Sequence, residues 1–407
     1  MNYLWGLFGI ACILGIAFLF SNNKRRINIR TISIALAIQI AFAFIVLKWP
    51  LGRAALQKVT DGVNSVISYA NEGINFLVGG IYTPESGITH VFLFNVLGII
   101  IFFSALISVL YYLGIMQFVI KYVGGALAKL LGTKKAESFS ATANIFVGCT
   151  EAPLVIKPFI DKLTQSELFA VMVCGLASVS GSVLVGYSLM GVPLEYLLAA
   201  SIMSAPAGLL LAKIMIPETE QSQEDVEGFK MARDEESSNV IDAAANGAST
   251  GLQLALNVGA MLLAFIAMIA LLNGLLSLIG GWFGFDQLSI ELILSYIFAP
   301  LAFVIGVPWE EALTAGNFIG QKLVINEFVA YSNFAPLIDT LSEKSVVIIS
   351  FALCGFANLS SLGILLGGLG KLSPKRRPDI ARLGVKSIIA GALASCLSAA
   401  IAGMIIG

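Results

Sequence analysis

Two glutamates in strongly apolar surroundings are the first residues of this sequence that could carry chemistry. Glu151 ends the segment GCTE, and Glu327 begins the segment EFVAY. A carboxylate at the centre of a bilayer costs about 2.5–3.5 kcal/mol even on a lenient scale, so such residues usually have partners or a function. Each could lie at a membrane interface or pair with a lysine. Because both belong to interrupted segments in corresponding halves of the chain, we interpret them as binding residues.

A second set of polar groups lies in the octapeptide CGFANLSS, residues 354–361. Asn358 and Ser361 are three residues apart, a spacing that predicts one face of a helix. They could bind neighbouring hydroxyls of a polar solute, or the small residues could serve close helix packing. The counterpart CGLASVSG, residues 174–181, has smaller groups at both positions. Packing alone would favour the smaller groups, so we prefer the binding interpretation.

A small cation could be held by Asn144, Ser178 and backbone carbonyls freed where the apolar segments break. These are hard oxygen donors, which suit sodium. The sequence contains no cluster of cysteine and histidine that would favour a transition metal.

The composition requires a membrane around these groups. The chain has 407 residues, of which 57% are hydrophobic and 12% charged, against roughly 25% charged in soluble domains. A span needs about 20 apolar residues, and we expect eight. The expected spans are 3–20, 32–49, 91–117, 166–190, 192–216, 252–280, 346–370 and 383–406.

The loops between these spans predict the orientation. With the N-terminus outside, most of the 24 Lys and Arg residues fall on the cytoplasmic side, as the positive-inside rule requires. Both termini are then periplasmic. Residues 50–77 are polar enough to form an external helix along the surface. The net charge of −1 gives no indication of nucleic-acid binding, and the absence of enzyme motifs argues against an enzyme.

The two octapeptides belong to two copies of one unit. The segment around 148–152 aligns with 306–312, and the segment 159–163 aligns with 318–323. Three spans separate the copies, so the second unit enters the membrane from the opposite side, which is an inverted repeat. Before each octapeptide, half-segments too short to cross lipid predict a re-entrant hairpin, such as 139–147 and 152–160.

The resulting organisation is an all-α integral membrane protein with eight transmembrane helices and two opposed hairpins. We divide the chain into N-terminal helices, a first repeat, an acidic cytoplasmic connector, a further helix and a second repeat. The boundaries are 1–117, 118–216, 217–250, 251–285 and 286–407.

Three long motifs in order, NIFVGCTEAPL, NEFVAY and CGFANLSS, resemble those of the concentrative nucleoside transporter family over essentially the whole chain. The resemblance is closest to bacterial sodium-coupled members. It implies a homotrimer in the bacterial inner membrane, with a scaffold domain and a transport domain that moves like an elevator to import nucleosides with Na⁺.

The resemblance also implies roles for individual residues, carried over by position. The nucleobase would face Cys149, Thr150 and Glu151; the ribose would bind Glu327, Asn358 and Ser361, with Phe356 close by; and sodium would bind Asn144, Ser178 and the carbonyls of Val147 and Val179.

One position departs from the family pattern, because its members typically have glutamine where this chain has Cys149. A thiol is a weak hydrogen-bonding group compared with a carboxamide. We therefore expect a changed base preference with transport retained. Physical reasoning alone leaves open a proton-coupled symporter, and a symporter or facilitator for another small polar solute.

Overall fold

The computed structural model describes residues 2–82, 91–220 and 237–407, and all regular secondary structure within them is helical. The expectation of an all-α fold is confirmed. The helices of the N-terminal part are α1 (Asn2–Leu19), η1 (Lys24–Arg26), α2 (Ile29–Leu47), α3 (Pro50–Val78), η2 (Gly79–Ile81), α4 (Phe92–Asn95), α5 (Leu97–Tyr112) and α6 (Ile115–Leu131).

The remaining helices form two series in the same order, each with a hairpin, a broken helix and a long helix. The first series is α7 (Lys135–Ala143), η3 (Ala152–Lys162), α8 (Gln165–Ala177), α9 (Gly181–Leu189) and α10 (Leu194–Met215). The second is α13 (Trp309–Val324), α14 (Glu327–Phe334), η4 (Ala335–Thr340), α15 (Glu343–Leu353), α16 (Ser361–Gly367), α17 (Leu369–Leu372), η5 (Pro374–Arg376) and α18 (Arg377–Ile406). Between them lie α11 (Val240–Trp282) and α12 (Ile290–Val304).

Short polar residues define several helix starts, because they satisfy backbone N–H groups that have no partner within the helix. Asn28 accepts from the backbone of Thr31 at the start of α2. Thr164 caps α8 reciprocally with Glu167, and Asn326 caps α14 by accepting from Val329 N at 2.9 Å.

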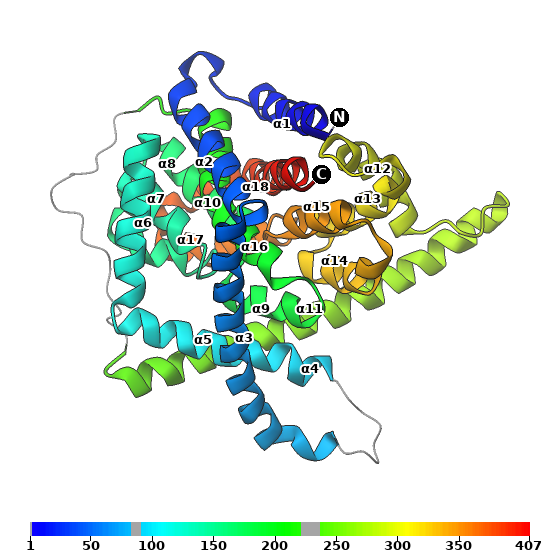
Figure 1. The fold of residues 1–407 in the computed structure, drawn as a ribbon, viewed down its shortest axis with the longest axis horizontal. Coiled ribbons are helices and arrows are strands. Elements are labelled where there is room, and N and C mark those ends of the chain that lie inside the picture. Colours follow the sequence, from blue (N-terminus) through cyan, green and yellow to red (C-terminus); the bar gives the residue numbers. More distant parts are fainter. Residues whose placement is uncertain (1, 83–90, 221–236) are drawn as a thin grey trace.

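The two long helices α10 and α18 form the centre of the molecule and pack against each other and against α8 and α15 (Figure 1). Most residues of α10 and α18 are buried. Helix α11 instead packs along α5 and keeps most of its other surface uncovered. Large apolar side chains such as Leu263 and Leu278 are 77% and 66% exposed there, as expected for a surface in contact with lipid or another copy.

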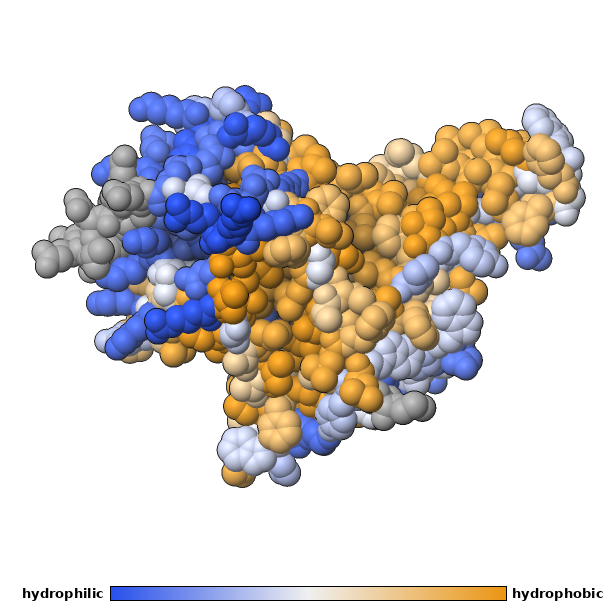
Figure 2. All heavy atoms as spheres, turned by 90° about the horizontal axis from the view of Figure 1, so that it is seen from above, coloured by the Kyte–Doolittle hydropathy of each residue, from blue (hydrophilic) through white to orange (hydrophobic). Residues whose placement is uncertain are grey.

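Six helical stretches within the described residues are long and apolar enough to cross a membrane, or seven if the bent pair α12 and α13 counts as one. Hydrophilic atoms gather at one end of the face seen in Figure 2, and hydrophobic atoms cover much of the rest. This distribution fits a multi-pass membrane protein. Helix α3 covers the expected surface helix at 50–77.

The expected span at 346–370 is not one helix. Helix α15 ends at Leu353 and α16 begins at Ser361, so Asn358 lies before α16 and the prediction that both polar residues share a helix face is wrong. Gly355 has φ +157°, and a side chain there would meet the backbone oxygen of Leu176 at 3.0 Å. The chain unwinds at this point because two backbones approach closely.

The second hairpin also lies at a different place from the sequence alignment. The segment around 306–312 contains the junction of α12 and α13, where the chain bends by 117°. The turn that corresponds to 144–151 is at 325–326, between α13 and α14. Helix α11 begins at Val240, inside the predicted connector, and the connector residues 221–236 lie outside the described residues.

Candidate functional site

The first hairpin has an irregular turn at residues 144–151, between α7 and η3. Glu151 folds back over this turn, and its Oε2 accepts a hydrogen bond from Gly148 N at 2.9 Å. One carboxylate oxygen therefore stabilises the turn. Cys149 and Thr150 lie inside it, with Cys149 buried and Thr150 half-buried.

Cys149, in the turn of the first hairpin, also interacts with groups of the second hairpin. Its thiol is within electrostatic reach of the Glu151 and Glu327 carboxylates. It also packs tightly on α8, since a side chain at Gly175 would meet Cys149 Cβ at 3.0 Å. The three residues Cys149, Glu151 and Glu327 thus belong to one region, although they come from different ends of the sequence.

Glu327 is the first residue of α14 and is only 4% exposed. A helix N-terminus favours a carboxylate because the backbone N–H groups point toward it. Oε1 accepts from the Tyr187 hydroxyl at 3.2 Å, and Oε2 accepts from Asn358 Nδ2 at 2.9 Å. An ionised carboxylate can accept about four hydrogen bonds, so each oxygen keeps acceptor capacity for a ligand hydroxyl.

Asn358 is held by the start of α16. Its Oδ1 accepts from Ser360 Oγ at 2.6 Å, from Ser361 N at 3.0 Å and from Ser361 Oγ at 2.9 Å. Ser361 Oγ also contacts the backbone oxygen of Phe356. With the oxygen fully used and one N–H directed to Glu327, the amide retains one N–H for another acceptor.

The two broken helices meet where each is interrupted. Phe356 N donates to Ser178 O at 3.2 Å, and Leu359 N donates to Leu323 O at 3.3 Å. The first bond joins the break between α15 and α16 to the break between α8 and α9, and the second joins the former to α13. The polar residues of both series are therefore fixed around one centre.

An oxygen-rich cradle lies at the break of the first series. Ser178 Oγ is within hydrogen-bond distance of the backbone oxygens of Asn144 at 2.7 Å and Val179 at 3.3 Å. Asn144 Nδ2 donates to Ser140 O at 2.9 Å, but Asn144 Oδ1 is buried and has no hydrogen-bond partner among the residues that the structure describes. A buried acceptor without a donor is costly, and hard oxygens suit an alkali cation, so these residues fit Na⁺. Val147 is also buried in the adjoining turn.

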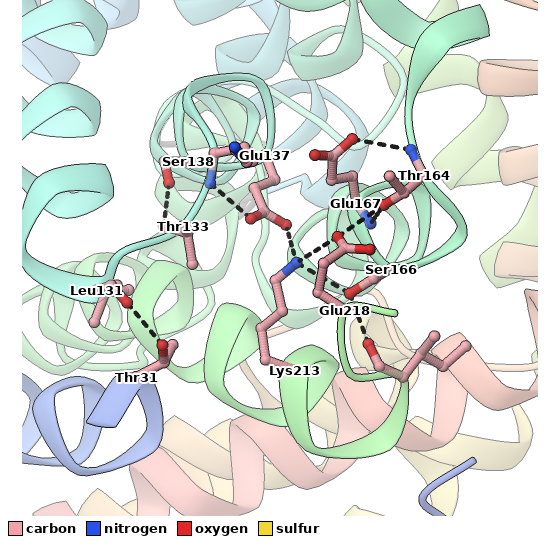
Figure 3. Close-up of polar contacts among 12 residues, drawn as sticks. Thr31, Leu131, Thr133, Glu137, Ser138, Thr164, Ser166, Glu167, Lys213 and Glu218 are labelled. Atoms are coloured by element: carbon pink, nitrogen blue, oxygen red, sulfur yellow. Dashed lines mark hydrogen bonds and ion pairs between the residues drawn. The ribbon is translucent and has the colours of Figure 1, made fainter. Parts of the chain in front are cut away.

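A separate polar cluster holds the base of the first hairpin against α8 and α10 (Figure 3). Lys213 Nζ lies 2.7 Å from Glu137 Oε2 and donates to Ser166 Oγ at 3.0 Å. Thr164 Oγ1 donates to Glu218 Oε2 at 2.8 Å. Removing one partner of such a buried pair typically costs about 3–5 kcal/mol, so we assign this cluster to the stability of the hairpin.

Two residues of the site were not predicted from the sequence. Tyr187 gave no sequence signal, because its bond to Glu327 joins positions 140 residues apart. Lys322 is a charged residue in an apolar segment, and that could have drawn attention to it; its side chain is buried beside the second break.

The structure brings the predicted residues together in two subsets. Glu327, Asn358, Phe356 and Ser361 are connected by hydrogen bonds to each other. Asn144, Ser178 and Val179 form the cradle in the first series, and the bond between the two breaks joins both subsets. Among the described residues, no group of three or more His, Cys, Asp or Glu side chains is placed to hold a metal ion.

Comparisons with known proteins match almost the whole chain to one kind of transporter. The family description "Na+ dependent nucleoside transporter N-terminus" matches residues 8–81, "Nucleoside recognition" matches 93–194, and "Na+ dependent nucleoside transporter C-terminus" matches 196–403.

Full-length relatives are similar. The uncharacterized transporter YutK of Bacillus subtilis is 59% identical over 406 residues, covering 100% of both chains. The nucleoside permease NupC of Helicobacter pylori is 53% identical over 415 residues, covering 99% of this chain and 98% of that protein. Human solute carrier family 28 member 3 is 38% identical over 412 residues, which are 98% of this chain and 59% of the human protein.

Solved structures share the fold. CNTnw in an inward-facing substrate-bound state has 53% sequence identity and a TM-score of 0.95, covering 100% of this chain and 98% of that chain. A CNTnw variant in an outward-facing state, also 53% identical, has a TM-score of 0.97, with coverage of 100% and 99%. The chain thus shares its fold with CNTnw in both an inward-facing and an outward-facing state.

Proposed function

Because this chain belongs to the concentrative nucleoside transporter family and is a nucleoside transporter rather than an enzyme, we propose that it imports nucleosides by Na⁺ symport. The single observation that carries the proposal is the pairing of a hydrogen-bonded Glu327–Asn358 site with the Asn144 cradle across touching broken helices. The family descriptions name Na⁺ dependence.

The ribose is the part of the substrate that Glu327 and Asn358 would bind. Adjacent 2′ and 3′ hydroxyls can both donate to the two oxygens of one carboxylate, and each Glu327 oxygen has one donor already. The remaining N–H of Asn358 can donate to a sugar oxygen. Ser361 keeps Asn358 in place, and Phe356 lies in the same break.

The nucleobase would lie toward the first hairpin, near Cys149, Thr150 and Glu151. This assignment rests on family resemblance and on the electrostatic interaction of Cys149 with the Glu151 and Glu327 carboxylates. Since a thiol forms only weak hydrogen bonds, Cys149 would contribute mainly shape to base recognition.

Sodium would be held by Asn144 Oδ1, Ser178 Oγ and the carbonyl oxygens of Val147 and Val179. Its charge would stabilise Asn144 Oδ1, which has no hydrogen-bond donor among the described residues, so binding would order the turn that carries Cys149 and Glu151. Moving one charge down 100 mV releases about 2.3 kcal/mol, which can sustain roughly 50-fold accumulation of a neutral solute.

Alternating access would move the two series as one transport domain against a scaffold that includes α3, α5 and α11. The contacts among α8, α10, α15 and α18 support such a unit, as do relatives described in inward-facing, outward-facing and intermediate states. The exposed apolar surface of α11 supports a homotrimer. Light scattering of the purified protein should give three copies per particle; a monomer would contradict this assembly.

The protein would lie in a bacterial inner membrane with both termini periplasmic. Its similarity to bacterial permeases and the distribution of basic residues in the sequence support this location. A C-terminal alkaline phosphatase fusion should be active, because that enzyme matures in the periplasm. A fusion that is expressed and inserted but inactive would place the C-terminus in the cytoplasm.

Uptake of labelled uridine into proteoliposomes tests the function. We expect uphill accumulation driven by an inward Na⁺ gradient, strong competition by other nucleosides and little competition by uracil, which lacks ribose. Accumulation driven equally by a proton gradient without Na⁺ would identify a proton symporter. Equilibration without accumulation would identify a facilitator.

A further inference from the structure

Lys322 is a buried base that the proposed mechanism has not used. It lies near the C-terminal end of α13 and is 1% exposed. Its Nζ donates to Ala352 O at 2.8 Å and to Ser395 Oγ at 3.1 Å. Within the described ranges, no carboxylate forms an ion pair with it. A buried ammonium without a close counterion is expensive, so its location requires an explanation.

The oxygens around Lys322 are those at the C-terminal end of a broken helix. Ala352 is the residue before the last residue of α15, and Ser395 Oγ in turn lies 3.2 Å from Cys354 O just beyond that helix. The last carbonyls of a helix have no partner within it and carry partial negative charge. The ammonium therefore sits where such an end would attract a free cation.

The first series has the equivalent helix end but a different set of groups. Helices α9 and α16 begin at the matching residues Gly181 and Ser361, 180 positions apart. By this offset the end of α8 at Ala177 corresponds to position 357, yet α15 ends four residues earlier, at Leu353. The additional unwound residues 354–357 follow Ala352, whose carbonyl accepts from Lys322. The end of α8 instead lies against Asn144, whose Oδ1 has no donor among the described residues.

We propose that Lys322 is a tethered cation that fills, in the second repeat, the position that Na⁺ takes in the first. This inference rests on the proposed function. Lys322 and Glu327 attract each other electrostatically, so the protein itself supplies a positive charge near the ribose-binding carboxylate. Glu151 in the first hairpin interacts electrostatically with no lysine of the described ranges, and a mobile Na⁺ supplies its balance. A core with two carboxylates and one built-in cation needs one mobile cation to become neutral before it crosses lipid.

The test is to remove the tethered charge and leave room for an ion. In wild type, calorimetric uridine titrations at increasing Na⁺ should give a Hill coefficient of about 1, and in Lys322→Ala about 2, since the coefficient is limited by the number of sites. Lys322→Arg keeps a cation and should remain at about 1. Lys344→Ala removes a lysine that lies over the Trp5 ring and should change nothing.

A folded Lys322→Ala protein that binds uridine with an unchanged affinity and a Hill coefficient of about 1 would overturn the inference. If Lys322→Ala does not fold, the wild-type ratio of charge to uridine, measured from reversal potentials in proteoliposomes, decides. One charge per uridine supports the tethered cation, and two overturn it. If the affinity of wild type for uridine does not depend on Na⁺, the proposed Na⁺ symport, on which the inference rests, is contradicted instead.

Discussion

The two broken helices of this protein are built alike but are completed differently. At the break between α8 and α9, Asn144 contributes a buried oxygen that no group in the described part of the chain satisfies. At the break between α15 and α16, Lys322 donates to Ala352 O, Ser395 donates to Cys354 O, and Asn358 Oδ1 accepts from Ser361 N. In the proposed function the first break would be completed by a mobile ion, and the second, completed by protein groups, would present Glu327 to a ligand. The difference suggests how two copies of one unit can divide ion binding from sugar binding.

The largest effect should come from the second break, through Glu327→Gln. The amide can accept at only one of its two head-group atoms, so the paired acceptors for the sugar hydroxyls are lost. Hydrogen bonds to charged groups contribute about 1.5–3 kcal/mol each, so uridine and adenosine should both bind about 100-fold more weakly. Isothermal titration measures this.

The exposed Glu72 of α3 offers a control for the loss of one negative charge, and Glu72→Gln should bind like wild type. If Glu327→Gln weakened only one class of nucleoside, the carboxylate would face the base instead of the shared ribose. The assignment of the two breaks would then have to be revised.

A smaller effect is expected at the first break, from Asn144→Ala. Removing the unsatisfied oxygen should weaken Na⁺ about 10-fold, since one such ligand contributes about 1.5 kcal/mol. Uridine affinity at saturating Na⁺ should stay near that of wild type. The Na⁺ concentration for half-maximal uridine binding is the measurement.

Asn144→Asp keeps an oxygen at this position and serves as the matched variant. It should retain tighter Na⁺ binding than Asn144→Ala. Equal Na⁺ dependence in wild type and Asn144→Ala would place the cation elsewhere and remove the contrast between the breaks.

The smallest effect should come from Cys149, in the turn of the first hairpin. Cys149→Gln supplies a carboxamide donor and acceptor, so it should change the ratio of uridine to adenosine affinity by about 3–10-fold, as expected for one neutral hydrogen bond of 0.5–1.5 kcal/mol. Cys149→Ser matches the thiol in size and should move the ratio less. A uniform change for both nucleosides would mean that Cys149 serves only packing.

Much of this contrast could be predicted from the sequence. The composition required membrane helices, and the paired octapeptides indicated a repeat. Glu327 and Asn358 were expected in one binding site, and the structure joins them by a direct hydrogen bond. Such inferences succeed because burying a polar group in lipid is costly, so the few polar residues in apolar segments carry strong information.

Other features depend on contacts between distant segments and could not be predicted. The place of Asn358 outside a helix follows from Gly355, whose backbone lies against α8 near Leu176. Tyr187 reaches Glu327 only after α9 and α14 pack. The sequence similarity around 306–312 predicts the second hairpin at the wrong turn. The helix cap at Asn326 marks the turn that the structure shows.

The most direct test of the account is whether the two breaks are coupled. Uridine should be titrated calorimetrically into the purified protein in Na⁺ and in choline, for wild type and Asn144→Ala. Na⁺ should strengthen uridine binding to wild type by about 10-fold or more, within the usual 1–3 kcal/mol of coupling between sites. Asn144→Ala should need a higher Na⁺ concentration to reach the same uridine affinity. Equal uridine affinity in Na⁺ and choline for the wild-type protein would contradict this coupling.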